Sequence, residues 1–164
     1  MGSGSSSSYS GAGGSQPYAN TYHVVQKELN KDKKDPDIYN PSTGYFKNPT
    51  ATNLENAEQN GSVYIGGNKA NGQYTYVMDQ NGEIIFGKRS NPNDSSKRAP
   101  HPTLIGGKDP LVQMAGMLDI RGGKIYSYDN QSGHYKPNPK SMKVADETFG
   151  KLPSTLFSKK KGGK

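Results

Sequence analysis

The sequence contains no cysteine among its 164 residues and no long apolar run. Without cysteine it has no disulfide framework, no thiolate nucleophile and no cysteine-ligated zinc site, which excludes cysteine hydrolases and zinc-finger proteins. A transmembrane helix needs about 18 consecutive apolar residues. Residues 1–20 also lack the basic and apolar regions of a signal peptide. We therefore expect no membrane partner and no signal peptide of its own.

Apolar residues are scarce as well. They make up 29% of the chain, against about 45–50% in globular proteins when glycine is also counted, so we expect part of the chain not to fold. Residues 1–15 contain seven Ser and five Gly, a composition typical of a flexible linker. The sequence predicts four parts: a flexible Ser/Gly-rich leader (1–20), an irregular arm with short helical turns (21–61), a folded domain (62–157) and a basic tail (158–164).

Within the arm, residues 22–30 and 53–59 can form short helical turns. Proline, Asn, Asp and Thr make the stretch between them irregular. Its aromatic residues are expected to pack onto the folded domain: Tyr39, Tyr45 and Phe46.

From Ser62 the pattern changes to short β-type runs separated by Gly and Asn. Turns at 79–82 and at Gly122-Gly123 predict two hairpins. A polar loop is expected at 90–102, and Met142, Ala145 and Phe149 recur at helical spacing. The runs that predict strands are 62–66, 73–79, 83–89, 103–107, 111–121 and 124–130, and the helix spans 139–151. The predicted fold class is α+β: a curled antiparallel sheet of about five strands, covered on one face by the C-terminal helix and preceded by the irregular N-terminal arm.

The net charge of +7 belongs to the second part of the chain. Residues 1–60 hold 5 basic and 6 acidic residues, whereas residues 61–164 hold 16 and 8. An anionic partner such as nucleic acid is one interpretation, and a solvated basic tail is the other.

Two histidines lie in the predicted folded domain. His101 stands between two prolines that stiffen the backbone, and His134 follows the second hairpin beside Gly133, which permits an unusual backbone angle. Together they can supply a general acid and a general base near neutral pH. Alternatively, each imidazole bonds to loop carbonyls and organises its own turn.

The densest polar cluster is the segment 132–136, which places Ser132, His134, Tyr135 and Lys136 within five residues. These four and His101 are the candidate catalytic residues. A Ser132–His134 nucleophile pair is disfavoured because no third group is positioned to orient the imidazole. The glycine pairs match no phosphate-binding loop, and no spacing matches a metal site, so we expect neither cofactor nor metal.

Tyrosines also alternate with lysines over residues 124–143. In a nucleic-acid binder the rings would stack on bases while the ammonium groups neutralise phosphates. Packing of Tyr126 and Tyr128 on one face of a strand explains the same pattern.

Residues 74–137 carry a series of short motifs: Gly82-Glu83-Ile84-Ile85, His101, Gly106-Gly107, Ala115-Gly116, Gly123-Lys124-Ile125, and Ser132-Gly133-His134-Tyr135 with Pro137. In this order they resemble the core of the plant IQ-motif-containing calmodulin-binding family, a core similar to C-terminal domains of bacterial polymorphic toxins. The chain has no IQ-type site, so calmodulin is not expected as a partner. The resemblance gives His101, Ser132, His134 and Tyr135 as candidates without assigning their roles.

The leading interpretation is therefore a toxin or effector domain of a secreted bacterial polymorphic toxin, used in bacterial competition. It would be delivered into a target cell as part of a larger protein and neutralised by an immunity protein. Its reaction would be cleavage of RNA or a nucleotide, with His101 and His134 as acid and base and Lys136 stabilising phosphate charge. The alternatives are an ADP-ribosyltransferase that uses His101, Thr103 and Glu147, and a secreted, non-enzymatic binding module.

Overall fold

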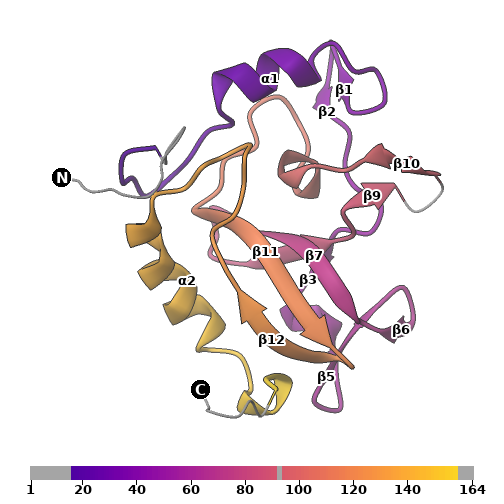
Figure 1. Ribbon diagram of the computed structural model, residues 1–164, viewed down its shortest axis with the longest axis vertical. Helices are drawn as coiled ribbons and strands as arrows, with labels where there is room; N and C mark the ends of the chain where they lie inside the picture. Colours follow the sequence, from indigo (N-terminus) through magenta and orange to yellow (C-terminus); the bar gives the residue numbers. More distant parts are fainter. Residues whose placement is uncertain (1–15, 92–93, 159–164) are drawn as a thin grey trace.

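The computed structural model describes residues 16–91 and 94–158. Its centre is a five-stranded antiparallel sheet, which together with the helices packed around it confirms the α+β class (Figure 1). The strands, in spatial order, are β12 (Lys124–Tyr128), β11 (Met114–Arg121), β7 (Gly72–Met78), β8 (Ile84–Gly87) and β3 (Thr52–Asn53).

Both predicted hairpins are present. Between β7 and β8, one carboxylate oxygen of Asp79 accepts hydrogen bonds from the backbone N–H groups of Asn81 and Glu83, both 2.9 Å long. Between β11 and β12, Gly122 and Gly123 have φ angles of 57° and 83°. Because two-residue hairpin turns favour positive φ at both positions, glycine suits this turn.

The membership of the sheet differs from the prediction. Its fifth strand is β3, from the predicted arm, which pairs with β8 through Thr52 and Phe86. The run at 62–66 instead forms β5 (Ser62–Ile65) in a separate small sheet with β4 (Glu58–Gln59) and β6 (Asn68–Lys69).

A strand at 103–107 was predicted wrongly, because residues 101–104 form the 3-10 helix η2 (His101–Leu104). Proline has a φ angle suited to the first helical turn and no backbone N–H to donate to a neighbouring strand. Pro102 therefore favours η2, and the Thr103 N–H donates to the Pro100 carbonyl. The predicted polar loop at 90–102 contains the short pair β9 (Ser90–Asn91) and β10 (Asp94–Arg98).

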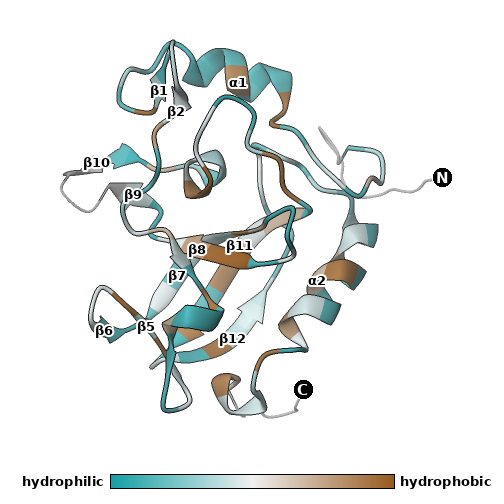
Figure 2. Cartoon of the chain, turned by 180° about the vertical axis from the view of Figure 1, so that it is seen from behind, coloured by the Kyte–Doolittle hydropathy of each residue, from teal (hydrophilic) through white to brown (hydrophobic). Residues whose placement is uncertain are grey.

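One face of the sheet is covered by α2 (Met142–Phe149), as predicted. Strand alternation places Tyr74, Tyr76 and Met78 on this face. Phe149 stacks on Tyr128 with ring centroids 3.8 Å apart. Figure 2 shows the apolar residues of β8, β11 and α2 gathered at this interface. The remaining short helices are η1 (Glu55–Ala57), η3 (Pro139–Ser141) and η4 (Ser154–Leu156).

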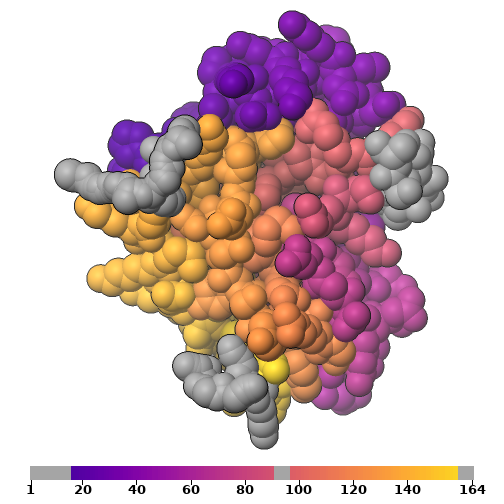
Figure 3. All heavy atoms as spheres, in the orientation of Figure 1, coloured from indigo at the N-terminus to yellow at the C-terminus, as the bar shows by residue number. Residues whose placement is uncertain are grey.

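The arm covers the opposite face, so it is part of the core. It contains α1 (Gln26–Asp32), β1 (Tyr39–Asn40) and β2 (Gly44–Tyr45). Its tyrosines pack against Val77, Ala115 and Tyr135 from the sheet and the following loop. Tyr39 and Tyr45 are buried as expected, whereas Phe46 is 45% exposed. Figure 3 shows this N-terminal segment covering one end of the molecule.

Parts of the predicted leader and tail, residues 1–15 and 159–164, lie outside the described residues. Within the described end of the leader, the Gln16 backbone N–H donates to the Lys136 carbonyl at 2.8 Å. In the described ranges, no helix is long and apolar enough to cross a membrane.

Candidate functional site

His101 is buried in η2, and both of its ring nitrogens are occupied. Nε2 lies 2.7 Å from the Gly116 carbonyl oxygen. Because a carbonyl only accepts, Nε2 carries the proton, and Nδ1 accepts from the Ser132 hydroxyl at 3.2 Å. Burial lowers the pKa of His101 to about 4, although the bond to Gly116 opposes this shift. The imidazole is therefore neutral at pH 7 and faces no solvent-filled site.

Ser132 and Tyr135 belong to the same buried network. The Ser132 hydroxyl accepts a 3.3 Å bond from the Tyr135 backbone N–H while it donates to His101. The fully buried Tyr135 donates its own hydroxyl to the Pro110 carbonyl at 2.5 Å. Burial and the nearby Asp109 raise the pKa of Tyr135 far above its usual value. The structure thus brings His101, Ser132 and Tyr135 together as a scaffold that joins the loop at 129–138 to η2 and β11.

Gly116 contributes to this scaffold through its lack of a side chain. A Cβ atom built on Gly116 would overlap the backbone carbonyl group of Asp129. The Tyr76 hydroxyl donates to that same carbonyl at 2.6 Å. The close approach of β11 to the start of the loop therefore requires glycine at this position.

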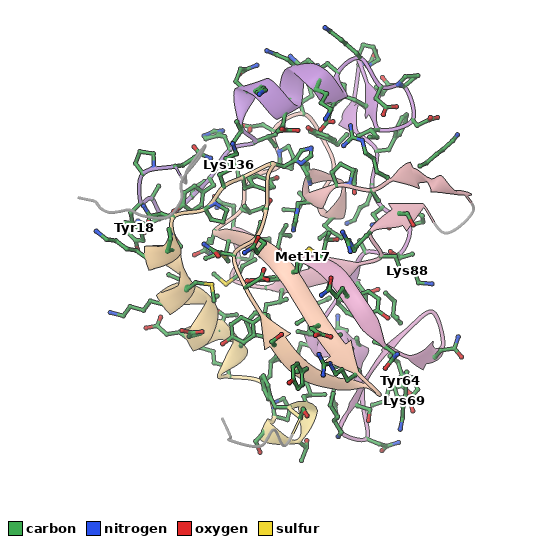
Figure 4. All side chains as sticks on the ribbon, viewed as in Figure 1. Tyr18, Tyr64, Lys69, Lys88, Met117 and Lys136 are labelled. Carbon is green, nitrogen blue, oxygen red and sulfur yellow. The ribbon has the colours of Figure 1, made fainter. Side chains whose placement is uncertain are left out.

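The unusual backbone angle expected at Gly133 is found at Lys136 instead. Gly133 is not among the residues with positive φ, whereas Lys136 has a φ of 44°. Figure 4 shows Lys136 at the end of the sheet that lies nearest to α1, beside the N-terminal segment. Its ammonium group forms no hydrogen bond or ion pair within residues 16–91 and 94–158.

His134 has a different environment from His101. Its Nε2 lies 2.8 Å from Oδ2 of Asp32, the last residue of α1. Its backbone carbonyl accepts from the Val25 N–H, just before α1. The imidazole is 13% exposed, and its Nδ1 forms no hydrogen bond with any described residue. In the neutral imidazole, donation from Nε2 to the carboxylate leaves the lone pair on Nδ1.

Asp32 is fully buried and binds three donors from distant parts of the chain. Besides His134, it accepts 2.6 Å bonds from the Tyr45 hydroxyl and from the Arg98 guanidinium. Burial alone would raise the pKa of Asp32, but the three hydrogen bonds outweigh it and lower that pKa to about 2. Burial is the largest cause that raises the pKa of Tyr45 far above its usual value, and the hydrogen bond to Asp32 raises it further.

Glu28 completes this arrangement, which we call the Asp32 cluster: Glu28, Asp32, Tyr45, Arg98 and His134. Glu28 precedes Asp32 by one helical turn, so both carboxylates lie on one side of α1. Its Oε1 is 3.8 Å from His134 Nε2. Arg98 is 40% exposed and also lies 3.9 Å from Asp35. The cluster thus combines a buried anion with an imidazole and a guanidinium that both reach solvent.

Sequence reasoning missed every member of this cluster except His134. Asp32 lies 102 positions before His134, in the stretch of the arm that was predicted to be irregular. The one available signal was the spacing of Glu28 and Asp32. It was lost because the predicted helical segment stopped at Asn30.

The residues weighed for ADP-ribosyl transfer do not come together. His101 and Thr103 share η2, which packs on the face of the sheet that the arm covers. Glu147 is exposed on α2, which covers the opposite face. The Thr103 hydroxyl is also engaged, because it donates to the Pro100 carbonyl at 2.6 Å.

The alternating tyrosines and lysines have mainly structural contacts. Tyr128 stacks on Phe149 and donates to Asp146. The guanidinium carbon of Arg121 lies 3.5 Å from the centroid of Tyr126. Lys124 donates to the carbonyls of Gly61 and Thr155. Tyr126, Tyr128 and Lys124 are therefore engaged in contacts within the fold.

No group of three or more His, Asp or Glu residues in the described ranges is arranged to hold a metal ion. No family model matches this chain, and neither a curated protein nor a solved structure is significantly similar to it. The site must therefore be interpreted from its own geometry.

Proposed function

We propose that this chain is an effector domain of a secreted bacterial polymorphic toxin that cleaves RNA or a nucleotide at the Asp32 cluster. One observation carries the chemical part of the proposal. His134 holds its Nε2 2.8 Å from a fully buried carboxylate and leaves Nδ1 without a partner among the described residues. This is the arrangement in which a carboxylate fixes the tautomer and orientation of a general acid or base.

The cost of the buried anion supports a functional interpretation. Removing an ionised carboxylate from water costs free energy even when it is paired with a cation. Apolar residues can often replace such buried pairs without loss of stability. Charged groups with perturbed pKa values that lie beside a partly exposed imidazole are typical of functional sites. Asp32 combines full burial with a pKa of about 2.

The proposal assigns proton transfer to His134 and Glu28 and gives His101 a structural role. One of the two groups accepts the proton of the ribose 2′-hydroxyl, whose oxygen then bonds to the adjacent phosphorus. The bond from phosphorus to the 5′-oxygen breaks, and the other group returns a proton to that oxygen. Glu28 is 24% exposed, so it can exchange protons with a ligand in solvent.

Arg98 is the proposed group that stabilises phosphate charge. Only one of its nitrogens is in contact with carboxylates, and a guanidinium has five N–H donors. A planar guanidinium can donate two parallel N–H hydrogen bonds to the oxygens of one phosphate group. Lys136 follows His134 by two residues and remains a second candidate for this role.

The toxin part of the proposal depends on the resemblance of residues 74–137 to polymorphic-toxin domains. In the structure, the motif residues His101, Gly116, Ser132 and Tyr135 form the scaffold that carries His134. The net charge of +7 suits a polyanionic substrate. Delivery as part of a larger protein and inhibition by an immunity protein belong to the same proposal.

Expression in a bacterial cytosol tests this function. The full chain is expected to arrest growth, and His134→Asn is expected to relieve the arrest, because an amide cannot transfer protons near neutral pH. The exposed His23 provides a matched control, and His23→Asn is expected to arrest growth like the unmodified chain. Equal growth of all strains would contradict the toxin assignment, and arrest by His134→Asn would remove His134 from the mechanism.

A further inference from the structure

A second feature of the arm is a pocket beside the end of α1. It has a volume of about 310 Å³ and is lined by Lys33, Tyr39, Pro41 and Lys108, which we call the lysine pocket. Three segments form it: the residue after α1, the start of the β1–β2 hairpin and the loop that follows η2. Figure 1 shows that loop rising toward α1 and the hairpin.

The charges of the lysine pocket are uncompensated. Neither the Lys33 nor the Lys108 ammonium group forms an ion pair or hydrogen bond with a described residue, and no carboxylate is among the lining residues. The nearest acidic neighbour of Lys108 in sequence, Asp109, is engaged with His23 at 3.0 Å. Asp32, which precedes Lys33, is occupied by its three donors.

Tyr39 provides an independent observation. It is only 7% exposed, yet its hydroxyl has no hydrogen-bond partner within the described ranges. Buried polar groups are nearly always hydrogen-bonded, so an unpaired phenol in a pocket lining leaves a donor available for a ligand. A hydroxyl donor in a pocket that two lysines also line suits an oxyanion.

The lysine pocket is connected to the Asp32 cluster. The ring of Tyr39 packs edge-on against Tyr45 with centroids 5.1 Å apart, and Tyr45 donates its hydroxyl to Asp32. Lys33 directly follows Asp32. An anion in the pocket would therefore contact Tyr39, which packs against the tyrosine that hydrogen-bonds to Asp32.

We propose that the lysine pocket binds a phosphate group of the substrate, held by Lys33, Lys108 and the Tyr39 hydroxyl. That this phosphate belongs to RNA or to a nucleotide rests on the proposed function. A nucleotide would present a terminal monoester, and RNA would present an internal diester. Pro41 and the Tyr39 ring supply apolar surface for the attached sugar or base.

Calorimetric titration of the full chain carrying His134→Asn tests the inference, since this variant is expected to bind without cleaving. The probes are pyrophosphate, a nucleoside 5′-monophosphate, and a short oligoribonucleotide with hydroxyl groups at both ends. Binding of the monophosphate but not the oligoribonucleotide would assign the pocket to a terminal monoester, and the reverse would assign it to a backbone diester. We expect Lys33→Gln with Lys108→Gln to weaken binding of the successful probe at least tenfold, and Tyr39→Phe to weaken it several-fold.

Lys143→Gln is the matched control, because Lys143 is exposed on α2, away from the pocket. It is expected to leave the affinity unchanged. No binding by any probe, or equal weakening by Lys143→Gln, would overturn the inference. If no probe binds although the unmodified chain cleaves RNA, the phosphate pocket alone is contradicted, whereas binding without any cleavage by the unmodified chain would contradict the proposed function alone.

Discussion

Asp32→Asn is expected to lower the free energy of unfolding by about 3–5 kcal/mol at pH 7, because it removes the buried anion to which Tyr45, Arg98 and His134 all donate. The pKa of Asp32 is about 2 in the folded protein and about 3.9 in the unfolded chain. The stability that its ionisation provides is therefore present above about pH 4 and is lost as the pH falls toward 2. Denaturant unfolding at pH 7 and pH 3 measures both effects.

Asp109→Asn is the control for this substitution. Asp109 pairs with His23 at the surface, where both side chains are more than half exposed. Such pairs contribute about 0–1 kcal/mol, so Asp109→Asn should change stability little. Similar losses for the two variants, or an Asp32→Asn effect that does not shrink between pH 7 and pH 3, would show that Asp32 is not the buried anion described above.

Gly116→Ala is expected to cost about 3 kcal/mol or more and to prevent stable folding if the chain is marginally stable. The added methyl group would overlap the Asp129 carbonyl, which is backbone and cannot rotate away. Relief would require the loop to move off β11, which would also strain the His101–Ser132 contact. Thermal unfolding followed by circular dichroism measures the change.

Gly133→Ala provides the comparison within the same scaffold. A Cβ atom on Gly133 meets no atom within 4 Å, and the φ angle of Gly133 is not positive. Replacing such a glycine reduces the freedom of the unfolded chain, so this variant should be neutral or slightly stabilising. If Gly133→Ala were as damaging as Gly116→Ala, the close packing at Gly116 would not be the cause.

The parts of the fold that follow from local chemistry could be predicted. The turn at 79–82 and Gly122-Gly123 allow tight hairpins between β-rich runs, and Met142, Ala145 and Phe149 form one apolar face of α2. The fifth strand could not be predicted in the same way. β3 has two residues, and it is a strand only because β8 supplies its partners, with Thr52 opposite Phe86 and Asn53 opposite Ile85.

The candidate site also combines residues that the local sequence singled out with partners that it could not indicate. The sequence singled out His101, Ser132 and Tyr135. In the structure, the Ser132 hydroxyl hydrogen-bonds to both of the others, and all three side chains form buried hydrogen bonds. The side-chain partner of His134 is Asp32 of α1, whose other donors come from β2 and β10, and no local pattern links these segments to residue 134. Pro100 and Pro102 stiffen the backbone at His101, as expected, but the result is a 3-10 turn that holds the imidazole inside the core.

Cleavage of a mixed-sequence oligoribonucleotide by the purified chain tests the central claim most directly. We expect the unmodified chain and His23→Asn to cleave at equal rates without added metal, and His134→Asn to cleave about 10²–10⁴-fold more slowly while circular dichroism shows that it remains folded. This result would place proton transfer at the imidazole that Asp32 orients. Cleavage by His134→Asn at the unmodified rate, or no cleavage by any of the three proteins, would contradict the proposal that the Asp32 cluster is an RNA-cleaving site.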